Sequence, residues 1–232
     1  MRLSELVQKL REIKSMGFVP SLRSGDTGIG YTFESLMGLG ETNIAIPDIG
    51  GKVEIKTTRR NASSLITLFT FNKGVWKYPQ SEILNTLGYY DQKDRIALKN
   101  TIFFGRSNQQ DIELHVDENR NTVFLTNLEL GVIAEWDLYV IVGKFYTKMS
   151  RLLFVLADTK RIDRKEHFHF NEAYILQDPD VRAFLDSFKR SIIGIDLRMH
   201  LKESGAVRNR GTAFRLREPD LINLYSTKQK LI

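Results

Sequence analysis

The stretch that decides the fold is residues 47–56, which read PDIGGKVEIK. Glu54 and Lys56 are two positions apart, so on a strand their side chains leave the same face. Asp48 precedes the strand and is separated from it by Gly50-Gly51, a flexible turn that can bring its carboxylate beside Glu54. The segment therefore predicts two carboxylates and one ammonium gathered at one site.

These residue types suit the hydrolysis of a phosphodiester bond. Asp48 and Glu54 can supply oxygen ligands to Mg²⁺, which takes few protein ligands and keeps several waters. The metal would activate a water and offset charge on the phosphate, and Lys56 could orient that water and stabilise the developing negative charge. The competing interpretation is an edge strand with a solvated Glu and Lys, because a bare D-x(5)-E-x-K pattern is common by chance. The neighbours favour chemistry: an apolar strand and Arg59-Arg60 follow, and another carboxylate, Glu34, precedes.

The rest of the chain alternates between helical and strand-like patterns. Apolar residues at helical spacing predict a first helix over residues 3–14. Further helices are expected at 32–37, 81–87, 180–189 and 219–225, and strands at 52–58, 64–71, 101–104, 112–116, 122–126, 152–158, 167–176 and 192–198. Residues 21–30 are a polar, glycine-rich stretch, and 202–217 are polar and basic. This order predicts an α/β or α+β fold with a central mixed β-sheet flanked by helices.

Composition narrows the class of protein. A chain of 232 residues can form one large domain or two small lobes. It has no cysteine, which excludes disulfides, zinc–thiolate sites and thiol nucleophiles. Its apolar runs are too short to span a bilayer and it begins without the apolar core of a signal peptide, so we expect a cytoplasmic protein with no membrane partner. The net charge of +6 favours a polyanionic partner.

Four blocks of sequence together carry a resemblance to a known family. They are GDTGIGYTFE at 25–34, PDIGGKVEIKT at 47–57, SLITLFT at 64–70 and RGTAFRL at 210–216. The second block matches the PD-(D/E)XK nuclease motif. In this order the blocks resemble the MvaI/BcnI family of Type II restriction endonucleases, relatives of the mismatch-repair nicking enzyme MutH.

The resemblance implies a restriction-endonuclease-like fold and a role for each motif. It implies one endonuclease domain over residues 1–232, with a catalytic lobe at about 20–100 and a recognition lobe that is mainly C-terminal and includes about 200–217, around a DNA cleft. The implied catalytic residues are Asp48, Glu54, Lys56 and Glu34, with Asp48 and Glu54 as ligands of Mg²⁺. It also implies a monomer that acts on double-stranded DNA and has a DNA methyltransferase as its genetic partner.

Residues 207–211 are the expected base-reading segment. Arg208 and Arg210 can each bind guanine O6 and N7, and Asn209 can bind adenine N6 and N7; the alternative is a solvated basic loop. Family members tend to carry a His-Asp pair where Arg208 and Asn209 stand, a departure that concerns the target sequence and not the chemistry. Further candidates for DNA contacts are Thr70, Asn72 and Lys73, and, for phosphates, Arg23, Arg59, Arg60 and Arg106.

Three functions compete at this point. The first is a Type II site-specific endonuclease acting on double-stranded DNA with Mg²⁺. The second is a MutH-like strand-specific nicking endonuclease in mismatch repair, which would use the same residues under different regulation. The third is a sequence-specific DNA-binding protein without catalysis, against which the complete set of Asp48, Glu54 and Lys56 counts.

Overall fold

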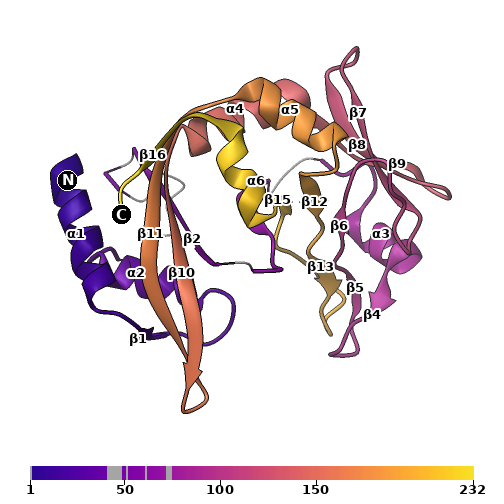
Figure 1. Cartoon of the computed structure of the whole chain (residues 1–232). Coiled ribbons are helices and arrows are strands. Elements are labelled where there is room, and N and C mark those ends of the chain that lie inside the picture. The colour runs from indigo at the N-terminus through magenta and orange to yellow at the C-terminus, as the bar shows by residue number, and fades with distance from the viewer. Residues whose placement is uncertain (1, 41–48, 51, 61, 72–74) are drawn as a thin grey trace. The chain divides into compact units, whose positions relative to one another are not determined.

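The computed structural model describes residues 2–40, 49–50, 52–60, 62–71 and 75–232 (Figure 1). The chain forms two compact units, each assembled from separated stretches. Unit 1 comprises Met1–Ile66, Tyr146–Asp180 and Arg217–Ile232, and unit 2 comprises Thr67–Phe145 and Val181–Leu216. The expected division into a catalytic lobe at about 20–100 and a recognition lobe that includes about 200–217 stays a prediction. The helices are α1 Leu3–Ser15, α2 Gly28–Leu36, α3 Gln80–Leu87, α4 Leu138–Met149, α5 Val181–Lys189 and α6 Glu218–Leu221, with the 3-10 helix η1 at Ile222–Leu224.

A mixed sheet forms the centre of unit 1. Its order is β1-β11-β10-β2, with β16 also paired to β11. β2 runs parallel to β10, whereas β1, β10 and β16 are all antiparallel to β11. The strands are β1 Val19–Pro20, β2 Glu54–Arg59, β10 Arg151–Ile162, β11 Lys165–Pro179 and β16 Tyr225–Lys230. The prediction of a central mixed sheet is therefore confirmed.

Helices α1 and α2 cover one face of this sheet (Figure 1). Leu6, Leu10 and Ile13 of α1 are all buried, as their helical spacing predicts. They pack in one cluster with Phe33 of α2 and Ile55 of β2. The odd-numbered side of β2 thus faces the core, and its even-numbered residues lie on the other face.

Helix α2 begins four residues earlier than the sequence predicted. The prediction placed its start at Thr32, but Gly28 and Gly30 already belong to the helix. The hydroxyl of Thr32 donates to the carbonyl oxygen of Gly28 and accepts from the amide of Leu22, which anchors the first turn. A side chain at Gly28 would put its Cβ 2.3 Å from the carbonyl oxygen of Arg23, so glycine is required here by close packing.

Unit 2 contains three small sheets. Their orders are β3-β15-β12-β6, β14-β13-β5-β4 and β7-β8-β9. The strands are β3 Ile66–Phe71, β4 Tyr89–Tyr90, β5 Ile96–Leu98, β6 Thr101–Ile102, β7 Ile112–Asp117, β8 Thr122–Asn127, β9 Gly131–Asp137, β12 Gly194–Asp196, β13 Met199–Leu201, β14 Val207–Asn209 and β15 Thr212–Leu216. Phenylalanines fill the core: Phe145 stacks on Phe184 at 4.1 Å and Phe69 on Phe214 at 4.9 Å.

Several elements of the structure are absent from the sequence prediction, among them strand β15 and helix α4. Strand β15 lies in the stretch 202–217, whose basic residues mask the buried Ala213, Phe214 and Leu216. Helix α4 follows β9. Its start is marked by Asp137, whose carboxylate accepts a hydrogen bond from the backbone amide of Val140 in the manner of a helix cap.

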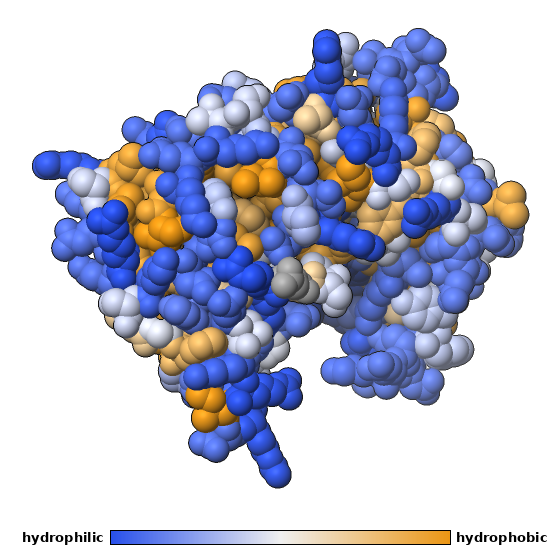
Figure 2. All heavy atoms as spheres, viewed as in Figure 1, coloured by the Kyte–Doolittle hydropathy of each residue, from blue (hydrophilic) through white to orange (hydrophobic). Residues whose placement is uncertain are grey.

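On the face seen in Figure 2, apolar side chains are visible in patches between hydrophilic ones. No helix among the described residues is long and apolar enough to cross a membrane.

Candidate active site and DNA-reading segment

Strand β2 places Glu54 and Lys56 side by side, as their spacing predicts. The ammonium of Lys56 donates to Oε1 of Glu54 at 2.7 Å. Glu54 is 4% exposed, so its carboxylate is nearly cut off from water. A carboxylate buried to this extent needs a compensating charge, because the loss of hydration is costly. Lys56 supplies part of that compensation.

A second lysine, Lys148, completes the surroundings of Glu54. It lies in the last turn of α4, and its Nζ is 2.8 Å from Oε2 of Glu54. This contact is an ion pair without a hydrogen bond, since Oε2 has no partner with hydrogen-bond geometry. The sequence prediction missed Lys148, because nothing in the sequence around it shows that α4 ends beside β2.

Tyr225 is a buried residue close enough to Glu54 to be affected by its charge. It is 2% exposed, and its hydroxyl donates to the carbonyl oxygen of Met149 at 3.0 Å. Burial, and to a lesser degree the charge of Glu54, raises the pKa of this phenol well above its ordinary value. Tyr225 is therefore neutral at any physiological pH and serves as a fixed, uncharged neighbour of the carboxylate.

Glu34 and Lys56 line the same hollow, which has a volume of about 320 Å³. Its walls come from α2 and from β2, where Thr57 is also exposed to it. A Cβ added at Gly30 would lie 3.8 Å from a carboxylate oxygen of Glu34 and 3.5 Å from the hydroxyl of Thr57, so Gly30 lies between these two side chains. The structure thus pairs Lys56 with Glu54 and places Lys56 and Glu34 along one hollow, whereas Asp48 lies outside the described residues.

The chemistry of these donors fits a hard divalent cation. Glu54 offers a buried carboxylate whose Oε2 accepts no hydrogen bond and lies in an ion pair with Lys148. Hard cations such as Mg²⁺ prefer such oxygen ligands. Among the described residues there is no group of three His, Cys, Asp or Glu side chains that could hold a metal. The second predicted ligand, Asp48, would have to join Glu54 from the neighbouring segment.

The predicted base-reading segment, residues 207–211, comprises β14 and the two residues that connect it to β15 in unit 2. Arg208 and Arg210 are exposed, whereas Asn209 is partly buried. Oδ1 of Asn209 accepts the amide of Gly211 at 2.7 Å, and its Nδ2 donates to Oε1 of Gln80 at 3.1 Å. The amide group of Asn209 is therefore engaged within the protein on both sides.

Arg198 binds residues 210 and 211 of this segment through hydrogen bonds. It was not singled out in the sequence. Its guanidinium donates to the carbonyl oxygens of Gly211 at 3.2 Å and Arg210 at 2.7 Å, and to the hydroxyl of Thr70 at 3.1 Å. Burial lowers the pKa of Arg198 from its ordinary value. Thr70 is thus joined to residues 210–211, while the other two candidates on its side, Asn72 and Lys73, lie outside the described residues.

The four arginines predicted to contact phosphate differ in whether carboxylates of the protein already pair with them. Arg59 forms two hydrogen bonds of 2.7 Å to the carboxylate of Glu166, which raise its pKa, and Arg60 is paired with Asp158 and Glu172. The guanidinium of Arg23 lies 3.9 Å from the centre of the Tyr31 ring. Arg106 is exposed. A contact of any of these four with phosphate stays a prediction.

Comparison with known proteins places the chain in a family. The model of the MvaI/BcnI restriction endonuclease family matches residues 7–225. Among solved structures, the restriction endonuclease MvaI in complex with cognate DNA substrate is 24% identical over 100% of both chains, with a TM-score of 0.83. MvaI in the absence of DNA is also 24% identical, over 99% of this chain and 97% of that chain, with a TM-score of 0.57. A search of curated proteins gave no match.

The structural likeness confirms the predicted restriction-endonuclease fold, and the family model covers the strand with Glu54 and Lys56 as well as the Arg208–Arg210 segment. The chain belongs to the MvaI/BcnI restriction endonuclease family.

Proposed function

We propose that this Type II restriction endonuclease cuts double-stranded DNA with Mg²⁺ at an active site centred on β2, and that Asp48, Glu54, Lys56 and Glu34 carry the reaction. The observation that supports the proposal best is the buried Glu54 with the ammonium of Lys56 at 2.7 Å. Burial of an ion is unfavourable unless it is paired, and a protein tends to keep such an arrangement where its chemistry is used.

Each residue has a role that follows from its position. Glu54 and Asp48 would hold the metal, which when bound supplies a Lewis acid and a water of lowered pKa. Lys56, which lines the hollow, would place its positive charge where negative charge develops on the phosphate. Glu34 lines the same hollow from α2 and could orient the attacking water by accepting a hydrogen bond. Lys148 balances the charge of Glu54 from the side of α4.

The test is cleavage of a large unmethylated DNA by the purified protein in the presence of Mg²⁺. Discrete fragments with a common end sequence are expected, and chelation of the metal should stop cutting. Glu54→Gln and Lys56→Ala should each lower the rate by more than about 100-fold, which is typical when one charge-stabilising group is lost, while DNA binding survives. The matched controls are Glu129→Gln and Lys14→Ala, which alter exposed residues remote in sequence from the site.

The same experiment separates the alternatives. Persistent single-strand nicks that depend on a repair partner would indicate a MutH-like enzyme, and binding without any cleavage of unmethylated DNA would contradict the proposal.

We infer further that the enzyme acts as a monomer in the cytoplasm beside a DNA methyltransferase. A restriction endonuclease endangers the DNA of its own cell, so a methyltransferase of the same sequence specificity is required to protect it. The oligomeric state can be measured by light scattering with and without duplex DNA. Resistance of DNA methylated at the cut sites is the corresponding test for the methyltransferase.

A further inference from the structure

Strands β10 and β11 form a long hairpin whose end carries unusual backbone geometry. Ile162 pairs with Lys165, so the turn consists of Asp163 and Arg164 alone. Both have positive φ, 48° and 64°. A two-residue turn of this kind favours glycine at its second position, because a Cβ is disfavoured there. The chain nevertheless has Arg164, an exposed residue with no packing role to account for it.

A polar hollow of about 750 Å³ lies beside this hairpin within unit 1. Its walls are the loop of residues 21–26, the end of β2 with the residues that follow it, and the hairpin itself. Exposed hydroxyls from Ser24, Ser63 and Ser64 line it together with several basic side chains. Among the described residues of this lining, basic side chains outnumber the two carboxylates, Asp26 and Glu166. None of them carries an aromatic ring on which a base could stack.

The positive charges of the hollow are of two kinds. Arg59 and Arg60 are neutralised by carboxylates, and Arg59 also donates to the carbonyl oxygens of Gly25 and Asp26, so it fixes the loop to the hairpin. By contrast, no ion pair involves Arg161, Arg164 or Lys165 within the part of the chain that the structure describes. All three are exposed, and the one carboxylate of the turn, Asp163, offsets only part of their charge, which leaves the hairpin end with an excess of positive charge.

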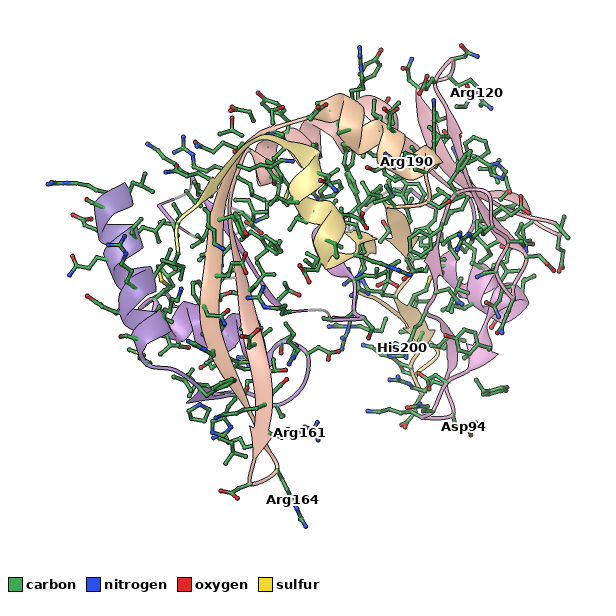
Figure 3. The ribbon with its side chains drawn as sticks, viewed as in Figure 1. Asp94, Arg120, Arg161, Arg164, Arg190 and His200 are labelled. Carbon is green, nitrogen blue, oxygen red and sulfur yellow. The ribbon has the colours of Figure 1, made fainter. Side chains whose placement is uncertain are left out.

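Two arginines of the hairpin, Arg161 and Arg164, project away from its strands (Figure 3). Figure 3 shows Arg161 and Arg164 at the end of the hairpin, pointing outward from it. In Figure 2 the same end is covered largely by hydrophilic side chains. Cations arranged in this way can contact an extended anionic partner without moving the strands.

We propose that the hollow and the hairpin end bind the sugar-phosphate backbone of duplex DNA, with Arg161, Arg164 and Lys165 as the contacts. The inference rests on the proposed function for the identity of the partner. Backbone strain often marks positions where a side chain has a function, and the positive φ of Arg164 fits a role of this kind. Phosphate contacts of this kind position the protein without reading sequence. Arg59 and Arg60, which are paired with carboxylates, then shape the hollow, while the hairpin end provides the positive charge that attracts phosphate.

The test compares two variants that lose the same charge. One is Arg161→Ala with Arg164→Asn, where asparagine tolerates positive φ and so preserves the turn. The control is Arg11→Ala with Lys14→Ala on the exposed side of α1. Binding of a non-cognate duplex is measured by fluorescence anisotropy over a range of salt concentrations with the metal chelated.

Each phosphate contact contributes about 0.9 to the slope of log K against log salt, so the hairpin variant should lose about 1.8 of that slope. The control should keep the slope of the wild type. Equal slopes for all three proteins would overturn the proposal. So would tight binding of inorganic phosphate that the hairpin variant loses while its DNA slope is unchanged, since the hollow would then be a site for small anions.

The proposal and the proposed function can fail separately. A wild type that binds duplex DNA but never cuts it contradicts the function, and the slopes still decide the role of the hairpin. Conversely, normal cutting by the wild type together with unchanged slopes contradicts only the hairpin contact. Melting temperatures of the three proteins show whether the turn is intact, and the hairpin variant, with asparagine in place of Arg164, should be no less stable than the wild type.

Discussion

At the scale of single residues, Asn209 illustrates how a candidate base reader can have a second role. Its side chain accepts from Gly211 and donates to Gln80, so both of its polar groups are used inside unit 2. An asparagine that reads adenine needs its amide group free for the base edge. The geometry therefore favours a role for Asn209 in shaping the segment that presents Arg208 and Arg210.

Asn209→Ala and Asn209→Asp should behave differently if Asn209 shapes this segment. Alanine removes two hydrogen bonds and should lower the free energy of unfolding by about 1–2 kcal/mol. Aspartate still accepts from Gly211, and Gln80 can turn its amide to donate to it, so stability and target choice should be largely kept. The measurements are chemical denaturation and the spectrum of cut sequences. If both variants are as stable as the wild type and both change the target, Asn209 reads a base.

The local part of the active site was predictable, and its distant part was not. Glu54 and Lys56 share a face because strand residues alternate, which spacing alone reveals. Lys148 joins them from the end of α4, and Arg198 reaches residues 210–211 through side-chain contacts. Such neighbours depend on how distant strands and helices pack, and no local pattern encodes that.

At the scale of elements, the start of α2 depends on close packing at Gly28. A Cβ there would lie 2.3 Å from the carbonyl oxygen of Arg23 and 2.7 Å from the hydroxyl of Ser21. The first of these is backbone and cannot rotate away, so the helix would have to shift. Since α2 carries Glu34, such a shift would also disturb the hollow that Glu34 shares with Lys56.

Gly28→Ala is therefore expected to reduce both stability and cutting. Overpacking of this kind costs about 1–3 kcal/mol, and displacement of Glu34 should slow cleavage. The control is Gly143→Ala in α4, where a Cβ meets no atom within 4 Å; it should raise stability by about 0.5–1 kcal/mol through helix propensity. Thermal unfolding and cleavage rates check both. A Gly28→Ala protein as stable as the wild type would show that α2 can adjust.

Sequence patterns also differ in how well they predicted whole elements. Helix α1 was predicted almost to its ends, because its apolar residues recur at helical spacing and their burial confirms the pattern. Strand β15 was hidden, since its buried residues follow a basic stretch that resembles a loop. The start of α2 was misplaced because glycines usually indicate a loop, whereas here they permit two segments to touch.

At the scale of the whole molecule, unit 1 is tied together by carboxylates that depend on pH. Asp158 of β10 and Glu172 of β11 share Arg60, which follows β2, and Glu172 also contacts Lys230 of β16. The pKa of Asp158 is lowered, chiefly by Arg60. The hydroxyl of Tyr174 first, and then Arg60 and Lys230, lowers the pKa of Glu172 from 4.5 to about 2.

A carboxyl group whose pKa is lower in the folded than in the unfolded state stabilises the fold above the unfolded pKa. That contribution is lost as the pH falls through the folded pKa. For Glu172 the loss should occur between pH 4.5 and about 2. The melting temperature of the protein is expected to fall steadily across this window, since Glu172 is protonated and its ion pair with Arg60 is lost.

Glu172→Gln tests this link between the four strands. Near neutral pH it should lower the melting temperature by about 2–4 °C, the change expected for about 1 kcal/mol in a chain of this size. The difference from the wild type should shrink as the pH approaches 2, where about half of the wild-type carboxyl groups are themselves protonated. Glu203→Gln, on an exposed turn, removes the same charge and should leave the melting temperature unchanged at every pH. A difference for Glu172→Gln that persists undiminished at the lowest pH would mean that its packing, and not its charge, holds β11 to β2 and β16.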